Sequence, residues 1–207
     1  MANLSEVLIF SAALVAVYLL PGPDMALIIT TSAFRGTKNG LMAALGLAIS
    51  RTLHVTLSAL GLATLFHAHP LLFDGVRWLG AAYLMWLGWK ILRAGDSDTS
   101  MPMNAAQAGL TALQRGIMTN LLNPKALMFC AFLLPQFIST QHALAPQYLL
   151  LGSILVALGL VFDVVYAFAA ARIARRMSGS RSVQKVSRLV FSSVFGFAAI
   201  RLALGGN

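Results

Sequence analysis

The sequence predicts an all-helical integral membrane protein with six transmembrane helices. The first observation is composition: of 207 residues, 58% are apolar and only 10% are charged, and the mean hydropathy is +0.80. Soluble domains are typically about 45–50% apolar and about 25% charged, and one soluble core of this length could not bury so much apolar surface. The second observation is that the apolar residues form six long runs separated by short polar segments. Disordered and nucleic-acid-binding proteins do not have this composition.

The six apolar runs are the expected membrane spans. A helix needs about 20 mainly apolar residues to cross the roughly 30 Å hydrocarbon layer. Five runs meet this length, at residues 4–34, 40–66, 70–92, 109–138 and 148–171. The sixth, at 189–204, is shorter, but residues 182–188 can extend it because Arg188 can reach the interface. The first run has no Lys or Arg before it and no small-residue cleavage site, so we expect a retained span rather than a signal peptide.

The positive charges predict the orientation of these spans. The net charge is +9, and eleven of the 15 Lys and Arg residues fall on one side of the predicted membrane. Because positive loops face the cytoplasm, both termini are expected on the periplasmic side. Trp86 and Trp89 lie at one end of the third run and Trp78 at the other, as aromatic belts require. The eleven residues are Arg35, Lys38, Lys90, Arg93, Arg115, Arg172, Arg175, Arg176, Arg181, Lys185 and Arg188.

A polar segment near the middle of the chain predicts two repeats within a single transporter domain, 1–207. Residues 94–108 form the expected cytoplasmic linker, between repeat one at about 1–93 and repeat two at about 109–207. Each repeat holds three spans. Since three is odd, duplicated units would enter the membrane in opposite senses, which is the inverted-repeat plan of many secondary transporters.

Prolines interrupt the first and fourth spans at corresponding places. The first contains Pro21-Gly22-Pro23-Asp24 and the fourth contains Asn123-Pro124-Lys125. Proline removes a backbone donor and clashes with the preceding turn, so both helices should be broken. Unwound backbone is tolerated at membrane depth only where it is packed in protein or lines a wet cavity. We therefore expect these seven residues to bind a substrate, although prolines also kink membrane helices simply to assist packing.

The residues at the breaks suit an amino-acid-like solute. Free N–H groups at the start of each half-helix favour an anion such as a carboxylate, and Lys125 adds positive charge there. Asp24 either receives the ammonium group of the solute or caps its own half-helix.

Three further ionisable residues lie in the middle of spans: Arg51, His54 and Asp163. Such residues are costly in lipid and usually face the bundle interior. Arg51 and Asp163 lie in equivalent spans of the two repeats, so they can face one another as a structural ion pair. Alternatively, Asp163 or His54 carries a coupling proton, histidine because it titrates near neutral pH.

Other features of the sequence bear on packing and on alternative classes. Small residues spaced four apart, as at Gly46 and Ser50, predict close helix contacts within the chain or in a homodimer. The single cysteine, Cys130, excludes an intrachain disulfide and argues against thiol exchange. We find no catalytic constellation and no metal-ligand cluster, so neither an enzyme nor a cofactor-binding or metal-binding protein is expected.

Several motifs along the chain resemble the lysine-exporter (LysE/RhtB) family of amino-acid exporters. The resemblance covers essentially the whole chain, and its most specific elements are the proline motifs at the two breaks, with Pro21, Gly22, Pro23, Asn123, Pro124 and Lys125 at the signature positions. Further matching stretches are Gly80-Ala81-Ala82-Tyr83-Leu84-Met85-Trp86-Leu87-Gly88, Arg115-Gly116, Asn120-Leu121-Leu122 and Pro135-Gln136-Phe137.

The resemblance implies a bacterial inner-membrane protein that exports amino acids or their derivatives, driven by the proton gradient. Arg51 departs from the family pattern, in which a small, polar or acidic residue is expected at this position. A fixed cation there would disfavour lysine or arginine unless Asp163 neutralises it, so we expect a neutral amino acid. The alternatives are a metal-ion exporter of the same fold and a structural membrane subunit without transport activity.

Overall fold

The chain is built from helices and short connections throughout the part that is described. The computed structural model describes residues 4–93, 105–177 and 181–204. Within these ranges no residue lies in a strand, which confirms the predicted all-helical class. The elements are α1 (Leu4–Leu19), α2 (Pro23–Ala59), α3 (Leu62–Ala68), α4 (Pro70–Arg93), α5 (Ala105–Leu121), α6 (Pro124–Met128), the π-helix η1 (Phe129–Leu133), the 3-10 helix η2 (Leu134–Phe137), α7 (Leu144–Met177) and α8 (Arg181–Leu204).

Length and hydropathy mark two of the described helices, α2 and α7, as able to cross a membrane. A third candidate is the pair formed by α5 and the helical stretch Pro124–Phe137, which are bent by 54° at the second proline break. The count of six spans stays a prediction.

The loop expected between the first and second spans is replaced by a bend of one residue. Gly36 has φ 82° and ψ 165°, inside the otherwise continuous α2. A positive φ is readily accessible to glycine because it has no Cβ atom. Beside the bend, Asn39 Nδ2 donates to the carbonyl of Arg35 at 2.7 Å. The first predicted span therefore corresponds to α1 plus the beginning of α2, and the second predicted span to the remainder of α2 together with most of α3.

Two other predicted boundaries differ from the structure, and a third agrees with it. The run 40–66 does not form one helix: α2 ends at Ala59, Gly61 adopts a left-handed conformation with φ 91°, and α3 begins at Leu62. Of the predicted linker 94–108, residues 105–108 already belong to α5, whereas 94–104 lie outside the described residues. The sixth run is extended at its start as predicted, because α8 begins at Arg181.

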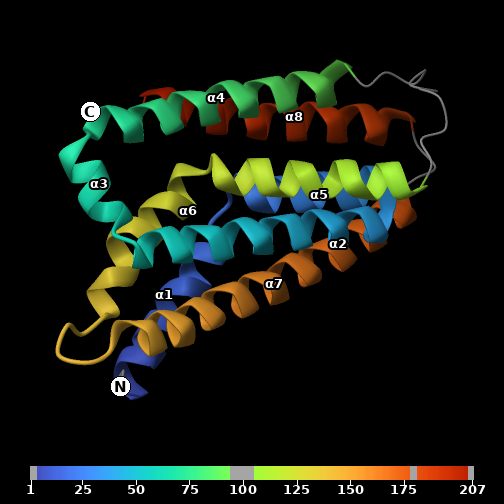
Figure 1. Ribbon diagram of the computed structural model, residues 1–207. Coiled ribbons are helices and arrows are strands. Elements are labelled where there is room, and N and C mark those ends of the chain that lie inside the picture. Colours follow the sequence, from blue (N-terminus) through green and yellow to red (C-terminus); the bar gives the residue numbers. More distant parts are fainter. Residues whose placement is uncertain (1–3, 94–104, 178–180, 205–207) are drawn as a thin grey trace.

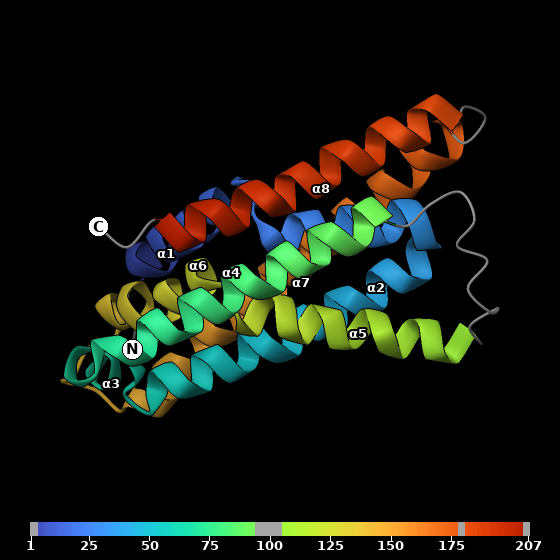
Figure 2. The ribbon, with the colours of Figure 1, turned by 90° about the horizontal axis from the view of Figure 1, so that it is seen from above.

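The helices are arranged around α2. This helix packs extensively against α5 and α7, and α4 packs against α8 (Figures 1 and 2). The start of α1 and the end of α8 lie at one end of the molecule, and the bend of α2, the end of α4 and the start of α5 lie at the other (Figures 1 and 2). The last turns of α4 and α7 at that second end carry basic residues, namely Lys90, Arg93, Arg175 and Arg176.

Two glycines allow α2 and α5 to approach one another closely. A Cβ atom added to Gly46 would lie 3.0 Å from the Cα of Gly116 and would overlap the carbonyl oxygen of Leu113. A Cβ atom added to Gly116 would lie 3.1 Å from the Cα of Gly46. The small-residue spacing at Gly46 thus serves packing within the chain, which brings the second break close to the middle of α2.

Replacing Gly46 by alanine should destabilise the protein by about 1–3 kcal/mol, because the added methyl group meets backbone rather than movable side chains. Thermal unfolding of the detergent-solubilised protein measures this loss. Gly75→Ala is the matched control: Gly75 is also helical, but no atom lies within 4 Å of its added Cβ. Equal unfolding temperatures for the two variants would contradict the α2–α5 contact.

Candidate functional site

Both helices that contain the proline motifs are interrupted at the motifs. Between α1 and α2, Gly22 is extended, with φ −166° and ψ −178°, and Pro23 opens α2. Between α5 and α6, Asn123 is extended and Pro124 opens α6. In both places the first turn of a helix tolerates proline because the N–H group there has no intrahelical partner.

Carbonyl groups at the end of α1 are satisfied by side chains from distant parts of the chain. In a continuous helix the carbonyl of Val17 would accept from residue 21, but Pro21 has no N–H group. Instead, the Lys125 ammonium donates to the carbonyl of Val17 at 2.7 Å and to that of Leu20 at 3.1 Å. The Tyr166 hydroxyl donates to the carbonyl of Tyr18 at 3.0 Å. Lys125 therefore caps the C-terminus of α1, a contact that the sequence did not predict, and the carboxylate binding expected of Lys125 stays a prediction.

Asn123 joins the second break to the first. Its Oδ1 accepts from the backbone N–H of Lys125 at 3.1 Å and so caps α6. Its Nδ2 donates to Oδ1 of Asp24 at 2.9 Å. The Asn123 side chain thus caps the start of α6 and also contacts the Asp24 carboxylate, which follows the first break.

Asp24 is held by groups from outside its own break. Its Oδ2 accepts from Asn120 Nδ2 at 2.6 Å and lies 3.5 Å from Nη2 of Arg51. With Asn123, two amides and one guanidinium surround the carboxylate, whose side chain keeps 19% exposure. These contacts come from the second break and from Arg51, and they do not correspond to the capping of α2, which was the alternative role.

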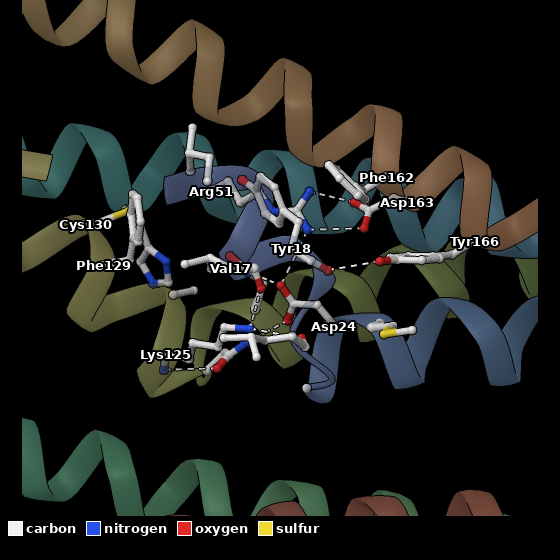
Figure 3. A pocket seen from close by; sticks show the side chains of 18 residues that line it. Val17, Tyr18, Asp24, Arg51, Lys125, Phe129, Cys130, Phe162, Asp163 and Tyr166 are labelled. Atoms are coloured by element: carbon white, nitrogen blue, oxygen red, sulfur yellow. Dashed lines mark hydrogen bonds and ion pairs between the residues drawn. The ribbon is translucent and has the colours of Figure 1, made fainter. Parts of the chain in front are cut away.

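Arg51 and Asp163 form a buried bidentate ion pair. Nη1 of Arg51 lies 2.6 Å from Oδ2 of Asp163, and Nη2 lies 3.3 Å from Oδ1. Both side chains are only 4% exposed, and the guanidinium also lies 5.2 Å from the ring centroid of Tyr18. The two residues therefore face one another, as the repeat arrangement predicts, and Asp163 neutralises the arginine (Figure 3).

These groups line a cavity of about 60 Å³. Of the predicted site residues, it brings together Gly22, Asp24, Asn123, Lys125, Arg51, His54 and Asp163. Pro21, Pro23 and Pro124 do not line it and act on its shape by breaking the helices. The remaining lining residues are Leu14, Val17, Tyr18, Leu20, Met25, Asn120, Ala126, Phe129, Cys130, Phe162 and Tyr166.

Sequence reasoning missed Asn120 and the aromatic residues of the cavity wall. Asn120 lies three residues before Asn123, so two amides at helical spacing in an apolar run were the available signal. In α7, Phe162 comes directly before Asp163 and Tyr166 follows it by one helical turn. The ring of Phe162 contacts the ring of Tyr18 (Figure 3). Aromatic residues are common in membrane helices, so these three carried no distinguishing signal.

Metal-ligating groups show no comparable gathering. Within residues 4–93, 105–177 and 181–204, no three His, Cys, Asp or Glu side chains are placed so that they could hold a metal ion.

Apolar helices around a charged internal cavity define a helical membrane protein. Residues 15–206 match the family model described as LysE type translocator, and the chain belongs to this family.

Some relatives of this chain are named as efflux proteins. It is 34% identical to a homoserine/homoserine lactone efflux protein of Salmonella typhimurium over 89% of each chain. It is 32% identical to a leucine efflux protein of Enterobacter sp. over 90% of each chain. An uncharacterised membrane protein of Vibrio cholerae is also 32% identical, over 89% of this chain and 90% of its own. No solved structure matches this chain.

Removing one partner of the Arg51–Asp163 pair should cost more stability than removing both. Asp163→Leu leaves a buried arginine with only the longer contact to Asp24, and a loss of about 3–5 kcal/mol is expected. The double variant Arg51→Met/Asp163→Leu should unfold at a higher temperature than Asp163→Leu alone, because no unpaired charge remains.

The control for this pair is Asp74→Asn, which breaks the Arg77–Asp74 pair, whose carboxylate is 44% exposed. It should change stability by only about 0–1 kcal/mol. Strictly additive losses in the double variant at 51 and 163 would contradict the buried interaction.

Replacing Lys125 by methionine should destabilise the protein, because it leaves the carbonyls of Val17 and Leu20 without their donor. A loss of about 1–3 kcal/mol is expected, chiefly from the part-buried carbonyl of Val17, and thermal unfolding in detergent measures it. Lys125→Arg keeps N–H donors and should lose less. Wild-type stability of Lys125→Met would show that the cap is dispensable.

Proposed function

We propose that this protein is a secondary exporter that moves amino acids or their derivatives out of the cytoplasm, across the bacterial inner membrane, by proton antiport. The observation that carries this proposal is the cavity between the two broken helices, lined by Asp24, Arg51, Lys125 and Asp163. Paired breaks in helices are the usual site of substrate and ion binding in transporters with repeats. The efflux proteins of homoserine and leucine among the relatives support an amino-acid solute.

The transporter would have six spans in two inverted repeats of three. Support comes from the equivalent positions of the two breaks, each followed by a new helix that begins with proline. The contacts of α2 with α7 and of α4 with α8 pair the second spans of the two repeats and the third spans with each other. Basic last turns of α4 and α7 at one end of the molecule support a cytoplasmic location of that end and periplasmic termini.

The solute would lie across the cavity with its two charged groups apart. Lys125 Nζ and Gly22, the residue that precedes α2, are close together, since an added Cβ on Gly22 would lie 3.8 Å from Nζ. This positive region at a helix N-terminus suits the carboxylate of the solute. The solute ammonium would meet Asp24, which is more exposed than Asp163 and is held by Arg51 only at 3.5 Å.

The charges of the cavity favour a neutral amino acid. Its lining contains two carboxylates, one guanidinium and one ammonium, so the formal charges balance. A zwitterion leaves this balance unchanged, whereas lysine or arginine would add an uncompensated charge in a confined site. The preference for a neutral amino acid thus rests on all four charged side chains, because Asp163 neutralises Arg51 and leaves no net positive charge in the cavity.

Proton coupling would act on Asp163 or His54. Protonation of Asp163 would remove the negative partner of Arg51, which is then free to turn toward Asp24. Protonation of His54, which is fully buried at the cavity, would add a positive charge beside the solute site. Either event changes which helices are held together and so favours one side of an alternating-access cycle.

Inside-out membrane vesicles test this function. With an acidic interior, the protein should accumulate a radiolabelled neutral amino acid, and a pH difference of one unit contributes about tenfold for each proton exchanged. Asp24→Asn should abolish accumulation, and Asp163→Asn should remove its dependence on the gradient. The surface variant Asp74→Asn, in which an exposed carboxylate is lost, is the control.

Each outcome of the vesicle assay bears on a different part of the proposal. Accumulation that is independent of the gradient would remove proton antiport. Failure with every amino acid would remove the solute class, and metal accumulation under the same conditions would then identify a metal-ion exporter. No transport of either kind would leave a structural membrane subunit.

A further inference from the structure

A buried amide oxygen of a cavity-lining residue lacks a hydrogen-bond partner. Asn120 is fully buried and its Oδ1 accepts no hydrogen bond from any other described residue. Other described side chains also contain buried polar atoms without partners, but of these residues only Asn120 and His54 line the cavity. A buried acceptor without a donor is unfavourable, so this oxygen is suited to a ligand that donates.

The orientation of the Asn120 amide follows from its neighbour. Its nitrogen lies 2.6 Å from Oδ2 of Asp24, and an ionised carboxylate only accepts hydrogen bonds. The NH₂ group must therefore face Asp24, and the carbonyl oxygen is the atom without a hydrogen-bond partner. An amide oxygen and a carboxylate oxygen bridged by one NH₂ group present two adjacent acceptors.

We propose that Asn120 is a ligand of the transported solute, whose ammonium group donates to Oδ1 of Asn120 and to the carboxylate of Asp24. This inference rests on the proposed function. An ammonium group has three N–H donors, so it can satisfy both acceptors at once. It also compensates the negative charge of Asp24, which a water molecule at the same position would not do.

The arrangement around Asp24 leaves this position for a cation from outside. The side-chain amides of Asn120 and Asn123 donate to the Asp24 carboxylate at 2.6 and 2.9 Å. Arg51 approaches this carboxylate only to 3.5 Å, because it pairs closely with Asp163. Lys125, the other cation of the cavity, donates to the carbonyls of Val17 and Leu20. The two cations of the cavity, Arg51 and Lys125, thus have closer partners than Asp24. The solute ammonium completes the neutralisation of the Asp24 carboxylate.

The test compares an amino acid with its deaminated analogue, which lacks only the ammonium group. The full-length protein in proteoliposomes is given the amino acid that it transports, and the analogue is measured as a competitor. In the wild type the amino acid should be preferred. In Asn120→Leu, which keeps the bulk but loses the oxygen, this preference should fall by about tenfold to hundredfold, as for the loss of a hydrogen bond to a charged group.

Two further variants separate binding from support of the fold. The double variant Asp24→Asn/Asn120→Asp exchanges the carboxylate and the amide. Its preference for the amino acid over the deaminated analogue should be at least tenfold higher than that of Asp24→Asn. This double variant also decides the matter if Asn120→Leu does not fold. Ser50→Ala is the matched control, because it removes a buried hydroxyl without a partner that lies outside the cavity lining. Its preference should equal that of the wild type.

The outcomes distinguish this inference from the proposed function. If Asn120→Leu binds the amino acid and the analogue with equal losses, Asn120 only supports Asp24 and the inference is overturned while export stands. An exchanged double variant as defective as Asp24→Asn leads to the same conclusion. If the wild type transports no amino acid, the proposed function and the inference fall together.

Discussion

Prolines at membrane depth remove backbone donors, and the site is arranged around this shortage. An unsatisfied backbone group away from water costs several kcal/mol, so a carbonyl freed by proline requires another donor. Pro21 leaves the carbonyl of Val17 open, and Lys125 from the other half of the chain supplies the hydrogen bond. In return, Asp24 beside the first break accepts from Asn123 at the second. The two breaks satisfy one another only when they lie side by side, and this places the cavity between them.

The positive charge of Arg51 is shared unequally between the two carboxylates of the cavity. Arg51 lies between two carboxylates but binds Asp163 at 2.6 Å and Asp24 only at 3.5 Å. A closely paired carboxylate gains little from a new cation, whereas a carboxylate held mainly by neutral amides keeps its attraction for one. The same protein interior therefore contains one stable ion pair and one acidic group suited to exchange partners with a solute.

Much of the architecture could be predicted from patterns along the chain. Composition identified a helical membrane protein, and the proline motifs located both helix breaks. The equivalence of two spans brought Arg51 and Asp163 into one hypothesis, and the structure places them in contact. The bend at Gly36 was not predicted, because a glycine among polar residues fits a loop as well as a single positive φ. The early end of α2 depends in the same way on the left-handed Gly61.

The sequence alone determined the properties that depend on residue type. These are the helical class, the positions that lack a backbone donor, and the spans that carry charged residues. Tertiary structure decided which partner each of these groups has. Lys125 of α6 caps the end of α1, and Asn120 enters the site through its contact with Asp24. The physical reason is that hydrogen bonds and ion pairs depend on distances of about 3 Å. Such distances, between residues about a hundred positions apart, are set by how the helices pack.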